Sequence, residues 1–555
     1  MATENETLFK VNYVDLLNEK IFPAEIGISG GKIKSITPIQ ERVSTYLMPG
    51  FIDAHVHIES SMVIPQAFAQ EAVVHGTIAT VSDPHEIANV CGTEGIDFML
   101  SDAAKTPFNF YFGVPSCVPA TPFENAGAVL GSKEVAELLK KPELGYLAEM
   151  MNFPGLIADD PEVLGKVKAA RQNHKPIDGH APGLSGKALQ KYIAAGISTE
   201  HEATTFEEGR EKMKAGMKVL IREGSAAKNF DALIPLMADA PEDALMFCSD
   251  DKHPDDLSKG HINLLVKRAL AKGFPLFKVL KAACVNPVMH YGLDCGLARV
   301  NEPANFIILD NLEEMKPKAT YLNGRKVAEG GKSLLEVHFP PTINHFKSNE
   351  AQLDLDLPIP AECHYANVIQ AIDGAIVTGA EVVAIKQSGS FQSDTERDFL
   401  KIVVVNRYEK QKKPNVALIN GFGLKEGAIA SSVAHDSHHI VAVGTKDEDL
   451  KACIKAIQAE KGGLSIAHQG SVEVMPLPYA GLMSAKSVAE AGLGYEKLTQ
   501  KVKNELSCKL AAPFMTLSFM ALPVIPKLKI TDDFLFDVEK FKPVGVFVST
   551  KRENA

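Results

Sequence analysis

Between residues 50 and 292 the sequence alternates short apolar runs with helical patterns. The apolar runs predict eight strands, at residues 51–56, 77–82, 109–114, 145–149, 176–179, 197–201, 217–221 and 245–249. Helical patterns cover residues 133–141, 161–173, 185–195, 206–215, 262–272 and 276–291. Such alternation is typical of a (β/α)₈ barrel, a fold of ~250 residues. The alternative, an open doubly wound sheet, favours a glycine-rich loop after the first strand, where this chain has His55-Val-His-Ile-Glu59.

Strand-like, glycine-punctuated segments flank the barrel region on both sides. We expect residues 1–48 and 296–340 to pair into one small β-sandwich domain, with the barrel at residues 49–295. Two consecutive prolines end the small domain, and residues 341–555 predict a C-terminal domain of mixed strands and helices. The predicted fold class is therefore α/β, a TIM-like (β/α)₈ barrel with a flanking β-domain and a C-terminal α/β (α+β) domain.

Composition excludes several classes of protein. The 555-residue chain has a formal net charge of -11 with both signs interspersed, so it offers no basic footprint for nucleic acid. No stretch approaches the ~20 apolar residues of a transmembrane helix, and the polar N-terminus does not predict a secretory signal. Eight scattered cysteines without a C-x-x-C spacing favour reduced thiols in the cytoplasm. A metal-binding role for Cys248 stays a minor alternative.

Side chains that bind metals lie where the predicted strands end. Side chains alternate along a strand, so His55 and His57 leave the first strand on one face, as two ligands of one ion would. In a (β/α)₈ barrel the carboxyl ends of all strands meet at one face. The other polar residues at those ends are Asp83, His85, Glu86, Glu149, His180, His201, Asp250 and Asp251. Surface or capping histidines would explain a single His-x-His, but not candidate ligands from at least five strands.

These residues predict a binuclear metal centre. Four histidines and an aspartate would saturate one ion, and Glu149 could bridge to a second ion of iron, manganese or zinc. A bound cation makes hydroxide available at neutral pH, and Asp250 would act as general base and then as general acid. The alternative for Asp250 is a solvated aspartate pair in a loop. Asp251 is the poorer candidate, because adjacent side chains of an extended segment point in opposite directions.

The ligand pattern resembles that of the amidohydrolase superfamily, metal-dependent hydrolases built on this barrel. Longer motifs are more similar to the bacterial adenine deaminases of that superfamily. The first is Pro49-Gly-Phe-Ile-Asp-Ala-His-Val-His-Ile-Glu-Ser-Ser-Met62, and others lie at residues 82–89, 149–155, 249–254 and 421–438. The resemblance therefore extends from the first strand of the barrel into the C-terminal region.

The resemblance implies a hydrolase of C–N bonds in cyclic amidines. Its reaction would be the deamination of free adenine to hypoxanthine and ammonia, a step of purine salvage in which a metal-bound hydroxide attacks C6. It implies Mn²⁺ or Fe²⁺, two per chain, with His55 and His57 on one ion and His180 and His201 on the other. Glu149 would bridge the ions or relay protons, and Asp250 would contact the hydroxide.

Other residues at the strand ends would have supporting roles. Glu59, Asp83, His85 and Glu86 would orient the ligands or form an accessory metal site. Mononuclear deaminases of the superfamily carry a glutamate three residues after the histidine of strand five, whereas Ala181-Pro-Gly183 follows His180 here. The proton for the purine ring would then come from Glu149 or Glu86. No lysine occupies the position of Glu149, which argues against a carbamylated-lysine bridge.

Two further groups of residues each have alternative interpretations. Arg222 and Ser225 follow strand seven and could bind ring nitrogens of the substrate, although Arg222 could equally pair with a carboxylate. His435, His438 and His439 with Asp436 form a second cluster outside the barrel, which by itself predicts a weak metal site or a surface loop. The resemblance favours a pocket lid or a subunit contact for this segment, with a purely structural role as the alternative.

Two other functions stay open from the sequence. One is an amidohydrolase that acts on another aminopurine or on a cyclic amide, since the metal ligands would be nearly the same. The other is a non-catalytic barrel that binds a small molecule, which loss of a ligand would indicate. The expected partner is a small molecule rather than nucleic acid or membrane, and the expected assembly is a homodimer.

Overall fold

The computed structural model of the protein describes residues 6–347 and 353–550 and divides into two compact units. The first unit comprises Met1–Pro84, Phe98–Ser116 and Gly131–Pro340. The second comprises His85–Asp97, Cys117–Leu130 and Pro341–Ala555. The sequence-based division into three domains, with boundaries at residues 48, 295 and 340, stays a prediction.

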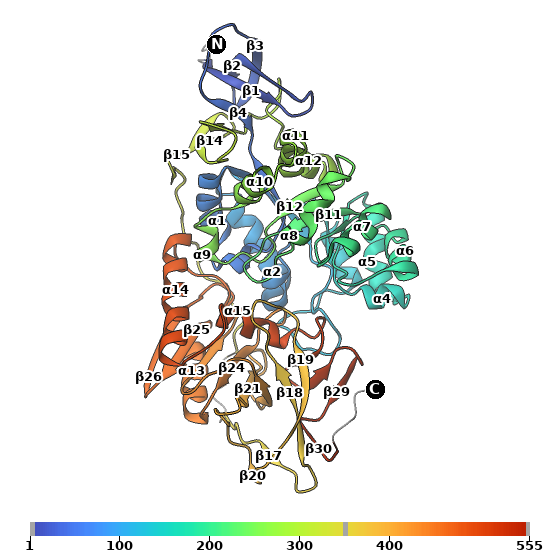
Figure 1. Ribbon diagram of the computed structural model, residues 1–555, viewed down its shortest axis with the longest axis vertical. Coiled ribbons are helices and arrows are strands. Elements are labelled where there is room, and N and C mark those ends of the chain that lie inside the picture. Colours follow the sequence, from blue (N-terminus) through green and yellow to red (C-terminus); the bar gives the residue numbers. More distant parts are fainter. Residues whose placement is uncertain (1–5, 348–352, 551–555) are drawn as a thin grey trace. The chain divides into compact units, whose positions relative to one another are not determined.

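One part of the first unit is an eight-stranded sheet made from two separate chain segments (Figure 1). Strands from the N-terminal segment join strands from beyond the barrel where β4 pairs antiparallel with β13. Alternate apolar side chains, including Val11, Ile26 and Phe306, form a common core on this sheet. In spatial order the strands are β16 (Lys332–Ser333), β15 (Arg325–Glu329), β14 (Pro317–Leu322), β13 (Phe306–Leu309), β4 (Tyr46–Pro49), β1 (Thr7–Asp15), β2 (Lys20–Ser29) and β3 (Lys32–Pro38).

The rest of the first unit is built on eight parallel strands, which confirms the predicted barrel. A five-stranded run from β5 to β9 and a three-stranded run from β10 to β12 follow one another in chain order. A parallel bridge between Val56 of β5 and Asp250 just after β12 joins the first strand to the last. The strands are β5 (Phe51–Val56), β6 (Thr77–Ser82), β7 (Asn109–Val114), β8 (Leu144–Met150), β9 (Ile177–Gly179), β10 (Thr199–Glu200), β11 (Lys218–Arg222) and β12 (Leu245–Cys248).

Helices connect these strands, and some of them begin at a side chain that caps the first turn. Asp160 accepts backbone N–H bonds at the start of α5, and Thr205 does so for α7. Ser185 precedes α6 but makes no such bond. The helical elements are η1 (Ile58–Ser61), α1 (Pro65–Ala72), η2 (Val73–His75), α3 (Ser132–Leu138), α4 (Phe153–Ile157), α5 (Pro161–Gln172), α6 (Gly186–Ala194), α7 (Phe206–Lys214), α8 (Phe230–Leu233), η3 (Ile234–Ala238), α9 (Pro254–Leu257), α10 (Ile262–Ala271), α11 (Leu276–Leu280), the π-helical turn η4 (Lys281–Val285) and α12 (Asn286–Tyr291). The helix α2 (His85–Ala103), which the sequence pattern did not predict, bends at Gly92.

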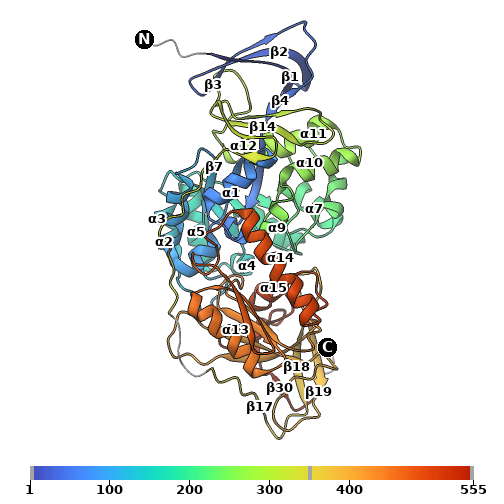
Figure 2. The ribbon, with the colours of Figure 1, turned by 90° about the vertical axis from the view of Figure 1, so that its left-hand side faces the viewer.

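The second unit is organised around a nine-stranded sheet with α13 (Asp447–Glu460) packed on it (Figure 2). Leu450, Ile454 and Ile457 of this helix share a core with Val403 and Ala442 of the sheet. The sheet runs β19 (Gly379–Ala384), β18 (Tyr365–Gln370), β22 (Asn415–Asn420), β21 (Leu400–Val405), β24 (Ile440–Gly444), β23 (Ala428–Ser431), β25 (Gly463–His468) and β26 (Ser471–Pro476), and β30 (Phe547–Val548) pairs with β18. The remaining elements are β17 (Pro358–Ile359), β20 (Gly389–Ser390), α14 (Val488–Glu505), α15 (Pro513–Ser518), η5 (Phe519–Ala521), β27 (Leu528–Ile530), β28 (Leu535–Asp537) and β29 (Lys542–Val544). Among the described residues, no helix is long and apolar enough to cross a membrane.

A buried polar network links β5 to the segment that follows β12. Asp53 of β5 accepts hydrogen bonds from the backbone N–H of Ser249 (3.0 Å) and from its hydroxyl. The Oδ2 atom of Asp53, which accepts from that hydroxyl, also lies 2.8 Å from Nε2 of His261, whose Nδ1 contacts the Thr77 hydroxyl at 2.7 Å. All four residues are buried. The carboxylate of Asp53 therefore ties together the strand that carries His55 and His57 and the one that leads to Asp250.

We expect Asp53→Asn to destabilise the protein by about 1–3 kcal/mol, because the amide group places a donor against donors and leaves a buried partner unsatisfied. The midpoint of thermal or urea unfolding of the purified chain measures this effect. Asp239→Asn, at an exposed position, is the matched control and should leave the midpoint unchanged. Equal midpoints for the two variants would mean that Asp53 contributes nothing to barrel closure.

Candidate metal centre

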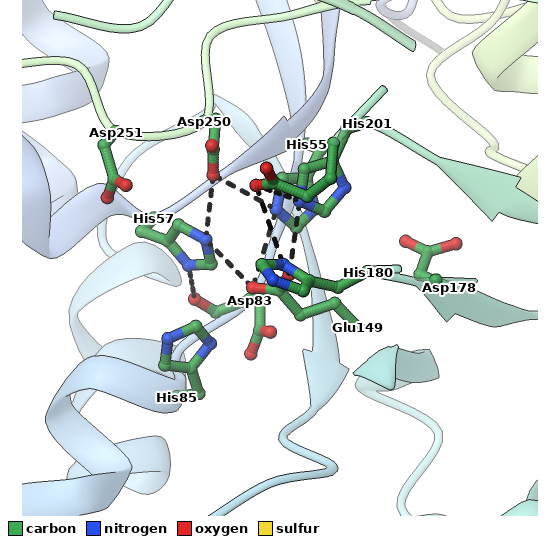
Figure 3. Close-up of polar contacts among 12 residues, drawn as sticks. His55, His57, Asp83, His85, Glu149, Asp178, His180, His201, Asp250 and Asp251 are labelled. Carbon is green, nitrogen blue, oxygen red and sulfur yellow. Dashed lines mark hydrogen bonds and ion pairs between the residues drawn. The ribbon is translucent and has the colours of Figure 1, made fainter. Parts of the chain in front are cut away.

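His55 and His57 stand at the end of β5 and point to the same side of the strand (Figure 3). Two backbone hydrogen bonds connect this end of β5 to the segment after β12. The Asp250 N–H donates to the His55 carbonyl (2.9 Å), and the His57 N–H donates to the Asp250 carbonyl (3.2 Å). The Nδ1 of His57 lies 3.1 Å from the carbonyl oxygen of Asp83. A carbonyl only accepts, so Nδ1 carries the proton and Nε2 is left to bind a cation.

Glu149, at the end of β8, lies between two pairs of histidines (Figure 3). Its Oε1 is 3.2 Å from Nε2 of His57 and 3.9 Å from Nε2 of His55. Its Oε2 is 2.7 Å from Nδ1 of His180 and 3.2 Å from Nε2 of His201. His180 follows β9 and His201 follows β10, so this buried carboxylate presents one oxygen to each pair.

Asp250 completes the group on the side of His55 and His57. Its Oδ1 lies 3.4 Å from Nε2 of His55 and 3.1 Å from Nε2 of His57. Its φ of 56° is a left-handed conformation that a non-glycine residue keeps only where surrounding contacts hold it. The neighbouring Asp251 accepts a hydrogen bond of 2.5 Å at its Oδ1 from the Ser60 hydroxyl.

The spacing of these atoms fits ligands around cations. Two ligand atoms that are each ~2.1 Å from one ion lie roughly 3.0–3.4 Å apart. The separations of Asp250 from His55 and His57, and of Glu149 from His57 and His201, are 3.1 to 3.4 Å. Within the described part of the chain, both ring nitrogens of His55 and Nε2 of His201 are buried without a hydrogen-bond partner. Buried polar atoms are rarely left so, and a divalent cation would satisfy them.

Both carboxylates are held in the ionised form that binds cations. Burial alone would raise the pKa of Glu149, but the neighbouring histidines, His180 foremost, outweigh it and hold that pKa well below its usual value. Burial likewise opposes ionisation of Asp250, and the Arg222 guanidinium with His55 and His57 holds its pKa well below the ordinary range. The two carboxylates therefore stay negatively charged, and the imidazoles around them can be neutral, as a cation site requires.

The other predicted residues of the first unit have several kinds of surroundings. The Asp83 carbonyl accepts from His57, and a carboxylate oxygen of Asp83 lies within 4.8 Å of ligand atoms of His57 and Glu149. Glu59 is buried in η1. The Ser225 hydroxyl donates to Asp256 (2.8 Å) and accepts from the His253 N–H (2.9 Å). Arg222 is buried and forms ion pairs with carboxylates, which is one of the two alternatives that the sequence left open for it. Substrate contacts of Arg222 and Ser225 stay predictions.

His85 and Glu86 open α2 in the second unit, where Glu86 contacts the second histidine cluster. Its Oε1 is 2.5 Å from Nδ1 of His435, and its Oε2 contacts Nε2 of His438. The Ala434 N–H donates to Nδ1 of His438 (3.2 Å), so the proton of that ring is on Nε2 and points at Glu86. The ligand atoms of Glu86, His435 and His438 also lie close enough together to hold a metal ion, so the weak metal site stays a prediction. The histidines are buried, so the surface-loop interpretation of the cluster is wrong. A lid or subunit-contact role stays a prediction.

Glu202, which the sequence pattern does not single out, lies at the histidines in the structure. Its Oε1 lies 3.6 Å from Nδ1 of His180 and 3.6 Å from Nε2 of His201. With these two histidines Glu202 forms a buried group whose ligand atoms could hold a metal ion. Because β10 ends at Glu200, the alternation rule that separates adjacent side chains does not apply to His201 and Glu202.

The sequence matches two protein-family models. The model of the amidohydrolase family matches residues 46–327, and that of the adenine deaminase C-terminal domain matches residues 375–542. The chain is 51% identical over 533 residues to a protein named adenine deaminase from Sulfurovum sp. (strain NBC37-1), covering 96% of this chain and 98% of that protein. It is also 51% identical over 536 residues to one of the same name from Salinibacter ruber, with the same coverage of both chains. A solved β-aspartyl dipeptidase from Fervidobacterium islandicum AW-1 has a TM-score of 0.45 and 16% identity, over 61% of this chain and all of that one.

Proposed function

We propose that this chain, which belongs to the adenine deaminase family of amidohydrolases, hydrolyses free adenine to hypoxanthine and ammonia. The near-complete coverage of relatives that carry this name supports the reaction. The observation in the structure that supports it most is Glu149, whose two oxygens each face one pair of histidines at the carboxyl ends of the barrel strands.

The residues that would hold the metal follow from their contacts. His55, His57 and Asp250 would bind one ion, His180 and His201 the other, and Glu149 would bridge them. Imidazole and carboxylate ligands suit Mn²⁺ or Fe²⁺, and we propose two ions per chain. Such ions would supply a hydroxide nucleophile for C6 at neutral pH.

Side chains of the protein would move the protons. Asp250 would accept the proton of the nucleophile and pass it to the departing amino group. Its backbone hydrogen bonds to His55 and His57 and the position of its Oδ1 beside their Nε2 atoms support this role. Glu149 and Glu86 remain the candidates for protonating the purine ring, because each carboxylate contacts histidines that could deliver a proton. Glu59, Asp83 and His85 would orient these groups or form an accessory site.

Ammonia release tests the proposed reaction. Protein loaded with Mn²⁺ or Fe²⁺ is expected to release ammonia rapidly from adenine and at least ~100-fold more slowly from adenosine, cytosine and dihydroorotate, because a closed pocket discriminates strongly by shape and hydrogen bonding. A coupled ammonia assay with metal content measured on the same sample provides the comparison. Metal-replete protein that leaves adenine intact would overturn the proposed substrate but not the metal centre.

Assembly and compartment are part of the same proposal. All eight cysteines are free thiols in the structure, and a reducing cytoplasm would keep them so. We propose a homodimer because closed two-fold assemblies are the commonest among soluble oligomers. Sedimentation of the metal-loaded protein would distinguish a dimer from a monomer.

A further inference from the structure

Three buried charged side chains form a row at the ends of three neighbouring strands. Glu202 follows β10, Arg222 ends β11 and Asp250 follows β12, and all three are at most 4% exposed. The Arg222 guanidinium contacts Glu202 through both terminal nitrogens: Nη1 meets Oε1, and Nη2 donates to Oε2 at 3.0 Å. Nη1 also donates to Oδ2 of Asp250 at 2.5 Å. One guanidinium therefore holds two carboxylates at once.

The two ends of this row face different pairs of histidines. The Oε1 of Glu202 lies 3.6 Å from both Nδ1 of His180 and Nε2 of His201. At the other end, Oδ1 of Asp250 lies 3.4 and 3.1 Å from Nε2 of His55 and His57. Because Oδ2 of Asp250 is engaged by Arg222, only Oδ1 is directed to the histidines. We call the group of His55, His57 and Asp250 the first half-site, and the group of His180, His201 and Glu202 the second half-site.

We propose that Arg222 is a positioning residue that sets the spacing between the two half-sites. This inference rests on the proposed binuclear centre and adds to it the element that fixes its geometry. A guanidinium is planar, with donors at fixed angles, so bonding to both carboxylates fixes the distance between them as well as their orientation. Lysine would supply the same charge from a single flexible ammonium group and could not hold both carboxylates in one plane.

Electron paramagnetic resonance of the Mn²⁺-loaded full-length protein tests the inference. Two Mn²⁺ ions that share a bridging ligand give an exchange-coupled multiline signal, whereas separated ions give the six-line signal of single ions. We expect the wild type at two ions per chain to show the coupled signal. We expect Arg222→Lys, at the same metal content, to lose at least half of it to the six-line form and to lower kcat by about 10-fold or more.

Arg268→Lys is the matched control, since Arg268 pairs with Glu223 and Asp231 at the half-exposed outer surface of the barrel unit. It should keep the wild-type spectrum and turnover. An Arg222→Lys protein with a wild-type spectrum at full metal content would overturn the inference. If that variant does not fold, Glu202→Gln, which leaves Arg222 bound to Asp250, takes its place, and an unchanged coupled signal there would equally overturn it. A wild type with two ions but only the six-line signal would instead refute the shared centre proposed above.

Discussion

Replacing Asp250 by asparagine should lower kcat for adenine by ~10²- to 10⁴-fold, which is the usual contribution of a positioned general acid–base group. Asparagine keeps the size of the side chain and an oxygen for the first half-site, but its amide cannot accept the proton of the nucleophile. The backbone bonds between residue 250 and β5 do not involve the side chain, so the fold around His55 and His57 should persist. KM for adenine should therefore change much less than kcat.

Steady-state kinetics at matched metal content measure this effect, and Asp251→Asn is the control. Asp251 is the adjacent acid of the same segment, and its Oδ1 accepts a hydrogen bond from the Ser60 hydroxyl. We expect less than a ~10-fold change in kcat for this variant, because its carboxylate is engaged by the Ser60 hydroxyl and is not proposed to carry the proton. Normal turnover by Asp250→Asn would show that another group carries the proton.

The barrel could be predicted because its buried parallel strands are short apolar runs with clear ends. The expected strands at residues 51–56, 77–82 and 109–114 coincide with the observed β5, β6 and β7. The helix α2 was missed because most of its first turns are buried on every side, which removes the polar face that marks an amphipathic helix. The segment 276–291, expected as one helix, contains a π-helical turn, and Pro287 lacks the N–H that a continuous helix would need.

The candidate site was predictable where it follows from strand ends, and not where it depends on pairing between side chains. The alternation of side chains along a strand predicts that His55 and His57 share a face. Because the carboxyl ends of all barrel strands meet at one face, Glu149 and Asp250 are expected near them. The row of Glu202, Arg222 and Asp250 depends on β10, β11 and β12 lying side by side in register. An acidic, a basic and a second acidic residue at the ends of three consecutive strands predict such a row, because neighbouring strands of a barrel are also neighbours in sequence.

Glu149→Gln should have the largest effect of all, with loss of about one of the two ions per chain and a fall in turnover of more than ~10³-fold, because it removes a ligand charge from both half-sites. Each oxygen of Glu149 faces a different histidine pair, so a neutral amide cannot satisfy both pairs: its nitrogen would turn a donor toward one of them. Metal analysis after gel filtration, followed by kinetics with added Mn²⁺, measures the two effects separately.

Glu143→Gln provides the control, because Glu143 immediately precedes β8 but is exposed, and its substitution should leave metal content and turnover unchanged. The double measurement also distinguishes the two roles expected for Glu149. If the variant keeps two tightly bound ions and loses only turnover, Glu149 relays protons and does not bridge. If excess Mn²⁺ restores the second ion and most of the turnover, the carboxylate serves to bind the metal and takes no part in proton transfer. Full activity without added metal would exclude Glu149 from the centre, despite its position between the four histidines.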